Sequence, residues 1–283
     1  MRRVCFATYS GGPEINSDDA LAAQELIELG IEPIALPWDA DSQPDGLPVV
    51  VRSCWNYHLK PHDFRSWIAQ RDVVWNPRRT LAWNMDKRYL LELESRGCQI
   101  APTVVVQQAA PLAAILENPG WREAVVKPVV SASAWQTFPV TLDSANLDQA
   151  RFEAVLRQGP VLVQEFVPEI RTLGEHSLIF FDGEFSHAVL KRPLEGDFRV
   201  QNEYGGSEAL VYAADWMIEQ ASEAVAMVPD QCLYARVDVV AKDRRLIVME
   251  LELIEPLLFL ALDPGAPARF ARAIARRVTE SQP

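Results

Sequence analysis

The sequence predicts a mixed fold, an α/β region followed by an α+β region, and three observations predict it. Apolar strands alternate with helices over residues 1 to about 80, a pattern typical of a parallel sheet covered by helices. From about residue 84 the strands come in pairs joined by turn signals such as Asp182-Gly183, as in antiparallel hairpins. Pro77 ends the last alternating strand, and we place the boundary between residues 1–83 and 84–283.

The first region is predicted to hold four strands and two helices. Residues 18–30 have helical spacing, two acids at the start and Gly30 at the end, which are start and stop signals of a helix. The strand over residues 46–55 is nearly all apolar in its first part, as expected when both faces of a sheet are covered. We predict strands at residues 2–10, 31–38, 46–55 and 73–77, and helices at 18–30 and 62–71.

The second region is predicted to hold two hairpins, a strand pair and several helices. One helix is expected over residues 83–98, stopping at Gly97. Two strands joined by a turn of small residues are expected over 124–140, and hairpins over 176–193 and 233–256. The other expected elements are strands at 99–106 and 160–168 and helices at 111–119, 147–159, 215–229 and 267–280.

Composition and charge argue against several classes of protein. The chain has 283 residues and a net charge of −12, which disfavours a general binder of nucleic acid or of anionic membranes. No apolar run approaches the roughly 18 residues of a membrane-spanning helix, and the start is predicted to be a strand rather than a signal peptide. The four cysteines are scattered without metal-binding spacing, so we expect reduced thiols in a cytoplasmic protein.

Acidic side chains lie in an apolar run at residues 248–260, where an unpaired buried carboxylate would be costly. Glu250 and Glu252 point to one face of the expected strand, because side chains alternate along a strand. The expected hairpin places Asp238 close to the level of Glu250, so three carboxylates converge. Such oxygen ligands suit Mg²⁺ that shares phosphate oxygens, and two such ions fit phosphoryl transfer. An acidic, solvent-exposed face of an edge hairpin is the alternative.

Two lysines are candidates for binding phosphate. Lys127 ends an apolar strand just before a Ser/Ala-rich turn that includes Ser133, and such turns let backbone N–H groups face phosphate oxygens. Lys87 opens an expected helix, where its ammonium and the positive end of the helix dipole act together on an anion. The strand ending in residues 162–168 offers an edge on which adenine could pair with backbone groups. No GxxxxGK[ST] or GxGxxG motif is present.

These features, in this order, resemble the ATP-grasp superfamily. The matching parts are Lys87, Lys127, "VQEFVPE", "LKRPLEGDFRVQNEYGG" and an aspartate followed by "MELE", and they cover nearly the whole chain. The stretches "VVRSCWNYH", "WNMDKRYL" and "VVKPVVSASA" are most similar to the ATP-grasp ligase group of D-cycloserine biosynthesis, with a glutathione-synthetase-like ATP-binding domain. The resemblance implies an ATP-grasp fold with an N-terminal pre-ATP-grasp α/β domain at 1–83 and two subdomains at 84–165 and 166–283.

The resemblance also implies a role for each matching residue. Lys87 and Lys127 would hold the ATP phosphates, Glu165, Phe166 and Val167 would meet adenine, and Glu175 would bind the ribose. Lys191 and Arg199 would approach the γ-phosphate and the reacting oxyanion, and Asp238, Glu250 and Glu252 would bind Mg²⁺, with two ions expected and Mn²⁺ as an alternative metal. Two departures stand out: the loop after Lys127 lacks glycine, and Glu252 stands where the wider family often has Asn.

The reaction that the resemblance implies is that of an ADP-forming ligase or cycloligase. A carboxylate-type oxygen of a small amino-acid-like substrate would attack the γ-phosphate, and an amine would then displace phosphate. The reaction of the cycloserine group is ring closure of O-ureido-D-serine. Relatives also suggest a homodimer or a higher homo-oligomer.

A substrate pocket is predicted where the first region meets the ATP-binding part. Arg52 and Ser53 end a buried strand, the usual place for ligand contacts in α/β sheets, and Arg52 could hold a carboxylate with two parallel hydrogen bonds. A structural salt bridge is the alternative for Arg52. Asp18 could contact a substrate amine, although Asp18 and Asp19 also fit the acidic start of a helix.

Other interpretations stay open from sequence. The chain could join two substrates rather than close a ring, could bind ATP without catalysis, or could be a metal-dependent hydrolase, although Lys87 and Lys127 argue against the last. A zinc site at His58 and His62 is disfavoured, because Pro61 lies between them and no third ligand is near. The role of Glu255 is left open, since Pro256 ends the strand.

Overall fold

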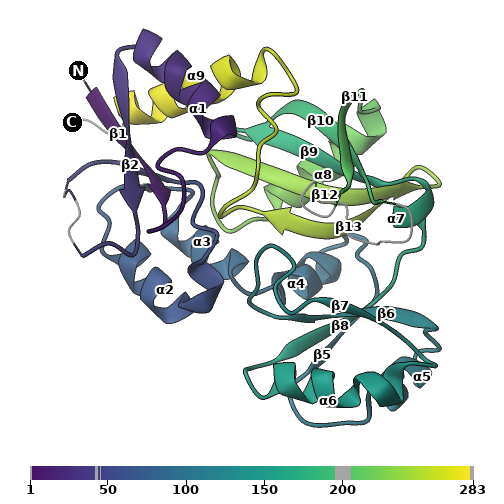
Figure 1. Cartoon of the computed structure of the whole chain (residues 1–283). Coiled ribbons are helices and arrows are strands. Elements are labelled where there is room, and N and C mark those ends of the chain that lie inside the picture. Colours follow the sequence, from purple (N-terminus) through teal and green to yellow (C-terminus); the bar gives the residue numbers. More distant parts are fainter. Residues whose placement is uncertain (1, 42–43, 45, 195–204, 281–283) are drawn as a thin grey trace.

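A computed structural model describes residues 2–41, 44, 46–194 and 205–280, and these residues form three sheets with helices packed on them (Figure 1). One sheet is parallel and belongs to the first region. The other two are antiparallel and face each other in the second region. The mixed α/β and α+β class expected from sequence is confirmed.

The first sheet has the strand order β2-β1-β3-β4 and is parallel throughout. Its strands are β1 (Arg2–Thr8), β2 (Ile31–Pro37), β3 (Val49–Val51) and β4 (Val74–Trp75). Parallel strands need long crossovers, which α1 (Ser17–Glu28), η1 (Tyr57–Leu59) and α2 (Pro61–Ala69) supply. Asn16 caps α1 by accepting from the backbone N–H groups of Asp18 and Asp19 at 3.0 and 2.9 Å, so these acids do lie in the first turn of a helix.

The second sheet has the order β5-β8-β6-β7 and is antiparallel. Its strands are β5 (Thr103–Val106), β6 (Glu123–Pro128), β7 (Phe138–Thr141) and β8 (Val161–Glu165). The helices α5 (Leu112–Glu117) and α6 (Ala145–Leu156) cover one face, where Leu116 and Phe152 pack on Val126. Alternation along β6 then turns Lys127 to the opposite face.

The third sheet has the order β11-β10-β9-β12-β13 and is also antiparallel. Its strands are β9 (Glu175–Phe181), β10 (Glu184–Arg192), β11 (Ser207–Val211), β12 (Tyr234–Lys242) and β13 (Arg245–Glu252). The helices α4 (Tyr89–Ser95) and α8 (Asp215–Ala226) cover one face, and the one-turn α7 (Glu169–Thr172) connects the two antiparallel sheets. Both predicted hairpin turns are present, with positive φ at Asp182 and Asp243.

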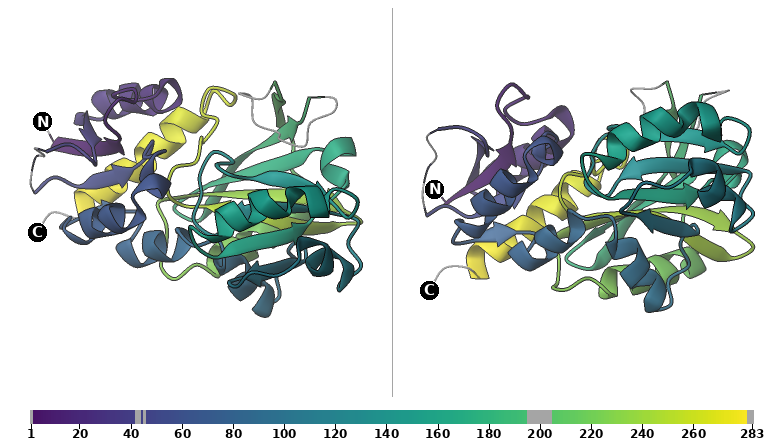
Figure 2. Two further views of the ribbon diagram at one scale, coloured as in Figure 1. Left: turned by 60° about the horizontal axis from the view of Figure 1, so that its bottom comes forward. Right: turned by 90° about the horizontal axis from the view of Figure 1, so that it is seen from below.

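The last helix, α9 (Ala266–Glu280), returns to the first region. Figures 1 and 2 show it running beside α1, between the parallel sheet and the five-stranded sheet. Phe270 of α9 stacks on Phe181 of β9 with ring centroids 4.9 Å apart, and it shares one core with Val4 and Phe6 of β1. The first region therefore uses residues from the far end of the chain, and the division at residues 83 and 84 stays a prediction.

The single helix expected over residues 83–98 is wrong. α3 (Arg78–Asn84) ends at Asn84, and α4 begins only at Tyr89. The amide of Asn84 bonds the backbone of β13, and Lys87 is turned into the interior, so tertiary contacts override the helical propensity of this stretch. In the described part of the chain, no helix is both long enough and apolar enough to cross a bilayer.

Candidate active site

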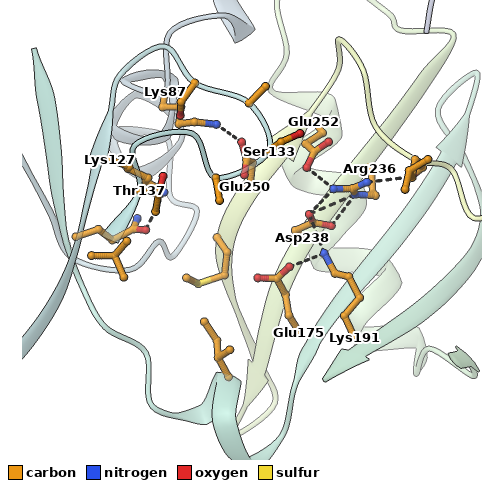
Figure 3. Close-up of a pocket in the computed structure, with 18 of the residues that line it drawn as sticks. Lys87, Lys127, Ser133, Thr137, Glu175, Lys191, Arg236, Asp238, Glu250 and Glu252 are labelled. Carbon is orange, nitrogen blue, oxygen red and sulfur yellow. Dashed lines mark hydrogen bonds and ion pairs between the residues drawn. The ribbon is translucent and has the colours of Figure 1, made fainter. Parts of the chain in front are cut away.

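A cavity of about 430 Å³ lies between the two antiparallel sheets, open also to the loop after β3. Its wall includes the loop after β6, the end of β8, and the faces of β9, β10, β12 and β13 opposite α4 and α8 (Figure 3). Seven acidic and four basic side chains line it, which is far more charge than an apolar ligand pocket carries. The acidic residues are Glu165, Glu175, Glu208, Asp238, Glu250, Glu252 and Glu255, and the basic ones are Lys87, Lys127, Lys191 and Arg236.

The predicted convergence of carboxylates is present. Asp238 of β12 lies directly opposite Glu250 of β13, and Arg236 lies opposite Glu252. These side chains face the cavity, while the alternate residues Leu251 and Leu253 are buried against the helices behind the sheet. The hairpin of β12 and β13 thus has one apolar face, which packs on the helices, and one charged face, which lines the cavity.

Beyond a backbone bridge between Val248 and Ile100, the outer edge of β13 is held by side chains. Asn84 donates to the carbonyl of Leu251 at 2.7 Å and accepts from the N–H of Leu253 at 3.0 Å. The hydroxyl of Tyr89 accepts from the N–H of Leu251 at 2.9 Å, and Asn76 donates to the carbonyl of Leu253 at 2.8 Å. An edge strand otherwise leaves these groups unpaired. The bonds fix the backbone from which Glu250 and Glu252 project.

Four carboxylates of the cavity are paired with cations. Lys87 pairs with Glu250, and Lys191 lies 2.5 Å from Glu175 and 3.1 Å from Asp238. Arg236 lies 2.9 Å from Asp238 and also pairs with Glu252 (Figure 3). Lys87 does not open a helix as expected. It lies between α3 and α4, and its N–H donates to the carbonyl of Val129 at 2.8 Å, at the start of the loop after β6.

The pKa values of these groups follow from burial and from their partners. Burial raises the pKa of Glu252 to about 7, with the charges of Glu250 and Asp238 adding to this and Arg236 opposing it. Burial also acts on Asp238, but Arg236 and Lys191 outweigh it and hold the pKa of Asp238 below its usual range. Burial lowers the pKa of Lys127 to about 8, and the nearby charge of Lys87 contributes. The site therefore holds groups whose protonation changes near neutral pH.

The donor set fits Mg²⁺ shared with a phosphate ligand. Asp238, Glu250 and Glu252 offer hard oxygen ligands on one face, and Mg²⁺ is usually held by one or two carboxylates together with substrate phosphates. Within the described residues, no group of three or more His, Cys, Asp or Glu side chains is arranged to hold a metal ion by itself. The arrangement is consistent with a metal that arrives with its nucleotide.

The other predicted nucleotide contacts lie in the same cavity. Glu165, Phe166 and Val167 line it at the end of β8, Glu175 at the start of β9, and Ser133 in the loop after β6. The free edge expected for this strand is wrong, because β8 pairs with β5 on one side and with β6 on the other. The N–H groups of Glu165 and Phe166 donate to the carbonyls of Pro102 and Glu123 at 2.8 and 3.0 Å. The structure brings these side chains together. Their individual roles stay predictions.

Three predicted substrate contacts do not line the cavity. Arg52 is 2% exposed, lies 2.9 Å from Asp19 and donates to the carbonyl of Pro256 at 2.8 Å. Ser53 is also buried, and Asp18 accepts from the N–H groups of Leu258 and Ala261. The prediction that these three residues contact the substrate is therefore wrong. The guanidinium of Arg52 is already bound in an internal ion pair, so it is not available to a substrate carboxylate.

Arg199, a predicted catalytic residue, lies outside the described residues. Lys191, the other one, is in the wall of the cavity. Arg236 was missed from sequence, although it stands two residues before Asp238 and so shares its face of β12. Trp55, a tryptophan expected from sequence to be able to touch a ligand rather than only to pack, lines the cavity too.

Comparisons with known proteins identify the family. Residues 4–76 match the family described as D-cycloserine synthetase DcsG, N-terminal domain. Residues 89–256 match the family described as prokaryotic glutathione synthetase, ATP-grasp domain. This chain belongs to the ATP-grasp family. Family members of this kind are ADP-forming carbon–nitrogen ligases that use ATP and a divalent metal, generally Mg²⁺, and the chain is an ATP-dependent ligase of that class.

Individual ATP-grasp relatives agree with this membership. The chain is 30% identical over 250 residues to the cycloserine biosynthesis protein DcsG of Streptomyces lavendulae, covering 81% of this chain and 83% of that protein. It is 30% identical over 195 residues to a glutathione synthetase of Prochlorococcus marinus, covering 64% and 61%. A crystal structure of D-cycloserine synthetase DcsG superposes with a TM-score of 0.87 at 26% identity, covering 98% and 99%. A D-alanine–D-alanine ligase from Bacillus anthracis shares the ATP-grasp fold with a TM-score of 0.72 at 13% identity, covering 99% and 98%.

Proposed function

We propose that this ligase phosphorylates a carboxylate-type oxygen of a small amino-acid-like substrate and lets an amine displace the phosphate, giving ADP. One observation carries the proposal: Asp238 and Glu250 face each other across β12 and β13, and four cationic side chains surround them in one cavity. Fixed charges around a site favour phosphoryl transfer through positioning and charge stabilisation, without a covalent enzyme intermediate.

Each group has a proposed task in that reaction. Lys87, Lys127 and the backbone near Ser133 bind the ATP phosphates, while Glu175 meets the ribose. Asp238, Glu250 and Glu252 hold Mg²⁺, two ions in our proposal with Mn²⁺ as a substitute, and the metal neutralises phosphate charge when bound.

The remaining tasks concern adenine and the reacting oxygen. Glu165, Phe166 and Val167 hold adenine at the hinge. Lys191, Arg236 and Arg199 stabilise the γ-phosphate and the oxyanion. Lys191 and Arg236 already converge on Asp238 in this structure, which supports placing them beside the metal and the transferred phosphate.

We further propose that the reaction is closure of O-ureido-D-serine to D-cycloserine. The ureido nitrogen bonded to the side-chain oxygen displaces phosphate from the activated carboxyl group, and hydrolysis of the bond to the carbamoyl group releases that group as carbon dioxide and ammonia. The support is the similarity of both regions to proteins named for cycloserine biosynthesis. We also propose that the protein is cytoplasmic and forms a homodimer or a higher homo-oligomer.

The test is incubation of purified protein with Mg–ATP and O-ureido-D-serine, with ADP and product measured by mass spectrometry. We expect ADP and D-cycloserine in equal amounts. Absence of turnover while ATP still binds would contradict the cyclisation. A panel of amino acids and amines would then test the alternative, intermolecular ligation. If no member of the panel led to ADP formation, a non-catalytic ATP-binding protein would be favoured.

A further inference from the structure

Glu255 differs from the acids that surround it in the cavity. Asp238, Glu250 and Glu252 each pair with a lysine or an arginine. The carboxyl group of Glu255 lines the same cavity, but it forms neither an ion pair nor a side-chain hydrogen bond with any residue that the structure describes. It follows β13 in the chain, and its neighbour Ile254 packs in a core of first-region residues.

The backbone around Glu255 is held at four successive carbonyl groups. Those of Leu253 and Ile254 accept from Asn76 and from the hydroxyl of Tyr234, each at 2.8 Å. The carbonyl of Glu255 accepts from the indole N–H of Trp55 at 3.2 Å, and that of Pro256 accepts from Arg52 at 2.8 Å. These hydrogen bonds fix the backbone position of Glu255 in the absence of a ligand. A pre-organised group loses little conformational entropy when a ligand binds.

The surroundings of Glu255 favour the binding of a positively charged group. Burial, strengthened by the negative charge of Glu252, raises the pKa of Glu255 well above its ordinary range. Lys87 opposes this shift, but its ammonium is already paired with Glu250. An ionised carboxylate in such a place is stable only with a cationic partner. The ring of Trp55, which also lines the cavity, adds an aromatic surface of the kind that cations prefer.

We propose that Glu255 binds the protonated amino group of the amino-acid-like substrate, with Trp55 forming the wall beside that group. This inference rests on the proposed function and adds the determinant of substrate choice: the ligase selects α-amino acids over acids without the amine. Arg236, which also acts electrostatically on Glu255, lies on the side where the substrate carboxylate would react. One small amino acid would thereby meet opposite charges at its two ends.

The experiment compares amino acids with their des-amino partners. The pairs are O-ureido-D-serine with 3-(ureidooxy)propanoate, and D-alanine with propanoate. Hydroxylamine, which is largely uncharged near neutral pH, is added to capture any activated carboxyl group that has not cyclised, as a hydroxamate. ADP release is therefore the common readout for all four acids. The quantity measured is kcat/KM for each acid, with KM for Mg–ATP and the Mg²⁺ requirement measured alongside.

We expect wild-type protein to prefer the amino acid of a pair by roughly 30-fold or more, the effect of losing one partner of a buried charge pair. Glu255→Gln should bring the two members within a few-fold of each other, mainly by raising KM for the amino acid, and should leave ADP release with the des-amino acid and KM for Mg–ATP unchanged. Glu255→Asp, which keeps the charge, should keep part of the preference. Glu219→Gln, an exposed acid on α8, should behave as wild type.

Several results would overturn the inference. Glu255→Gln with a wild-type preference would show that no ammonium binds there. Equal losses on both members of a pair, or a change confined to the Mg²⁺ requirement, would make Glu255 a general catalytic group or a metal ligand instead. Wild-type protein that binds Mg–ATP but releases no ADP with either pair would contradict the proposed function itself, and the inference would fall with it. A thermal unfolding midpoint matching wild type confirms that each variant is folded.

Discussion

Lys127 shows how a single residue in this site is tuned. Its ammonium donates to the amide oxygen of Gln164 at 3.0 Å, and it has no carboxylate partner among the described residues. Burial without such a partner lowers the pKa of Lys127 to about 8. An uncompensated cation in a cavity is poised for an anion such as the phosphate groups of ATP.

The protonation of Lys127 leads to a prediction about ATP binding. A lowered pKa means that the ammonium is lost as the pH rises through about 8, and the neutral amine attracts phosphate weakly. We therefore expect KM for Mg–ATP to increase above that pH. Lys127→Arg, which stays charged, should flatten the profile. Steady-state KM against pH for both proteins checks this, and profiles that rise in parallel would assign the effect to another group.

Glu250 carries the second prediction at this scale. Changing Glu250 to Gln removes the charge of a proposed metal ligand and the partner of Lys87, so turnover should fall by about two orders of magnitude or more. The fold should persist, because the side chain faces the cavity rather than the core. ADP release and circular dichroism of Glu250→Gln are the measurements. An unchanged rate would remove Glu250 from the metal site.

At the scale of single elements, β13 is the strand on which the site depends. Its inner edge pairs with β12, and its outer edge is held by Asn84 and Tyr89 from the segment that also carries Lys87. A displacement of this segment would move Lys87 and both glutamates together. The support of the strand and the chemistry of the site are therefore coupled.

That coupling can be measured with two variants. Asn84→Ala leaves two backbone groups of β13 unpaired, which should cost about 1–3 kcal/mol for each group and raise the Mg²⁺ concentration needed for half-maximal rate. Tyr89→Phe removes one bond only and should show a smaller effect in the same direction. Urea unfolding and Mg²⁺ titrations report the two quantities. A loss of stability with an unchanged Mg²⁺ requirement would show that Asn84 supports the fold without positioning the ligands.

Local patterns were enough to predict the hairpin that carries the acids. Alternation places Glu250 and Glu252 on one face, and the turn at Asp243 brings that strand alongside Asp238. The exact register was not predictable, because an irregularity after Asp238 shifts the pairing by one residue and sets Asp238 opposite Glu250 rather than Met249. Contacts distant in sequence could not be predicted in this way. The break of the helix before Tyr89 depends on the backbone of β13, and the burial of Arg52 depends on Asp19 and on the carbonyl of Pro256.

At the scale of the whole molecule, the pair of Arg52 and Asp19 joins the first region to the segment after β13. Arg52 binds Asp19 and the carbonyl of Pro256, and its guanidinium lies 4.8 Å from the ring centroid of Tyr234. Asp18 adds bonds to Leu258 and Ala261 in the same segment. The regions that bound the cavity are thus tied together beneath it.

Removing one member of this pair should destabilise the entire protein. Arg52→Met leaves Asp19 charged, buried and unpaired, which typically costs about 3–5 kcal/mol. Arg3→Met breaks an exposed pair with Glu32 and should cost under about 1 kcal/mol. Urea unfolding of both variants is the measurement. An Arg52→Met protein of wild-type stability with a raised KM for substrate would restore the original interpretation of Arg52 as a substrate contact.

The position of α9 has a consequence for how the chain is made. Ribosomes release β1 well before α9, yet Val4 and Phe6 share a core with Phe270. During synthesis β1 must therefore wait with part of its apolar surface uncovered until α9 has emerged. We expect β1, although it is made early, to be among the last strands of the nascent polypeptide to become fully protected.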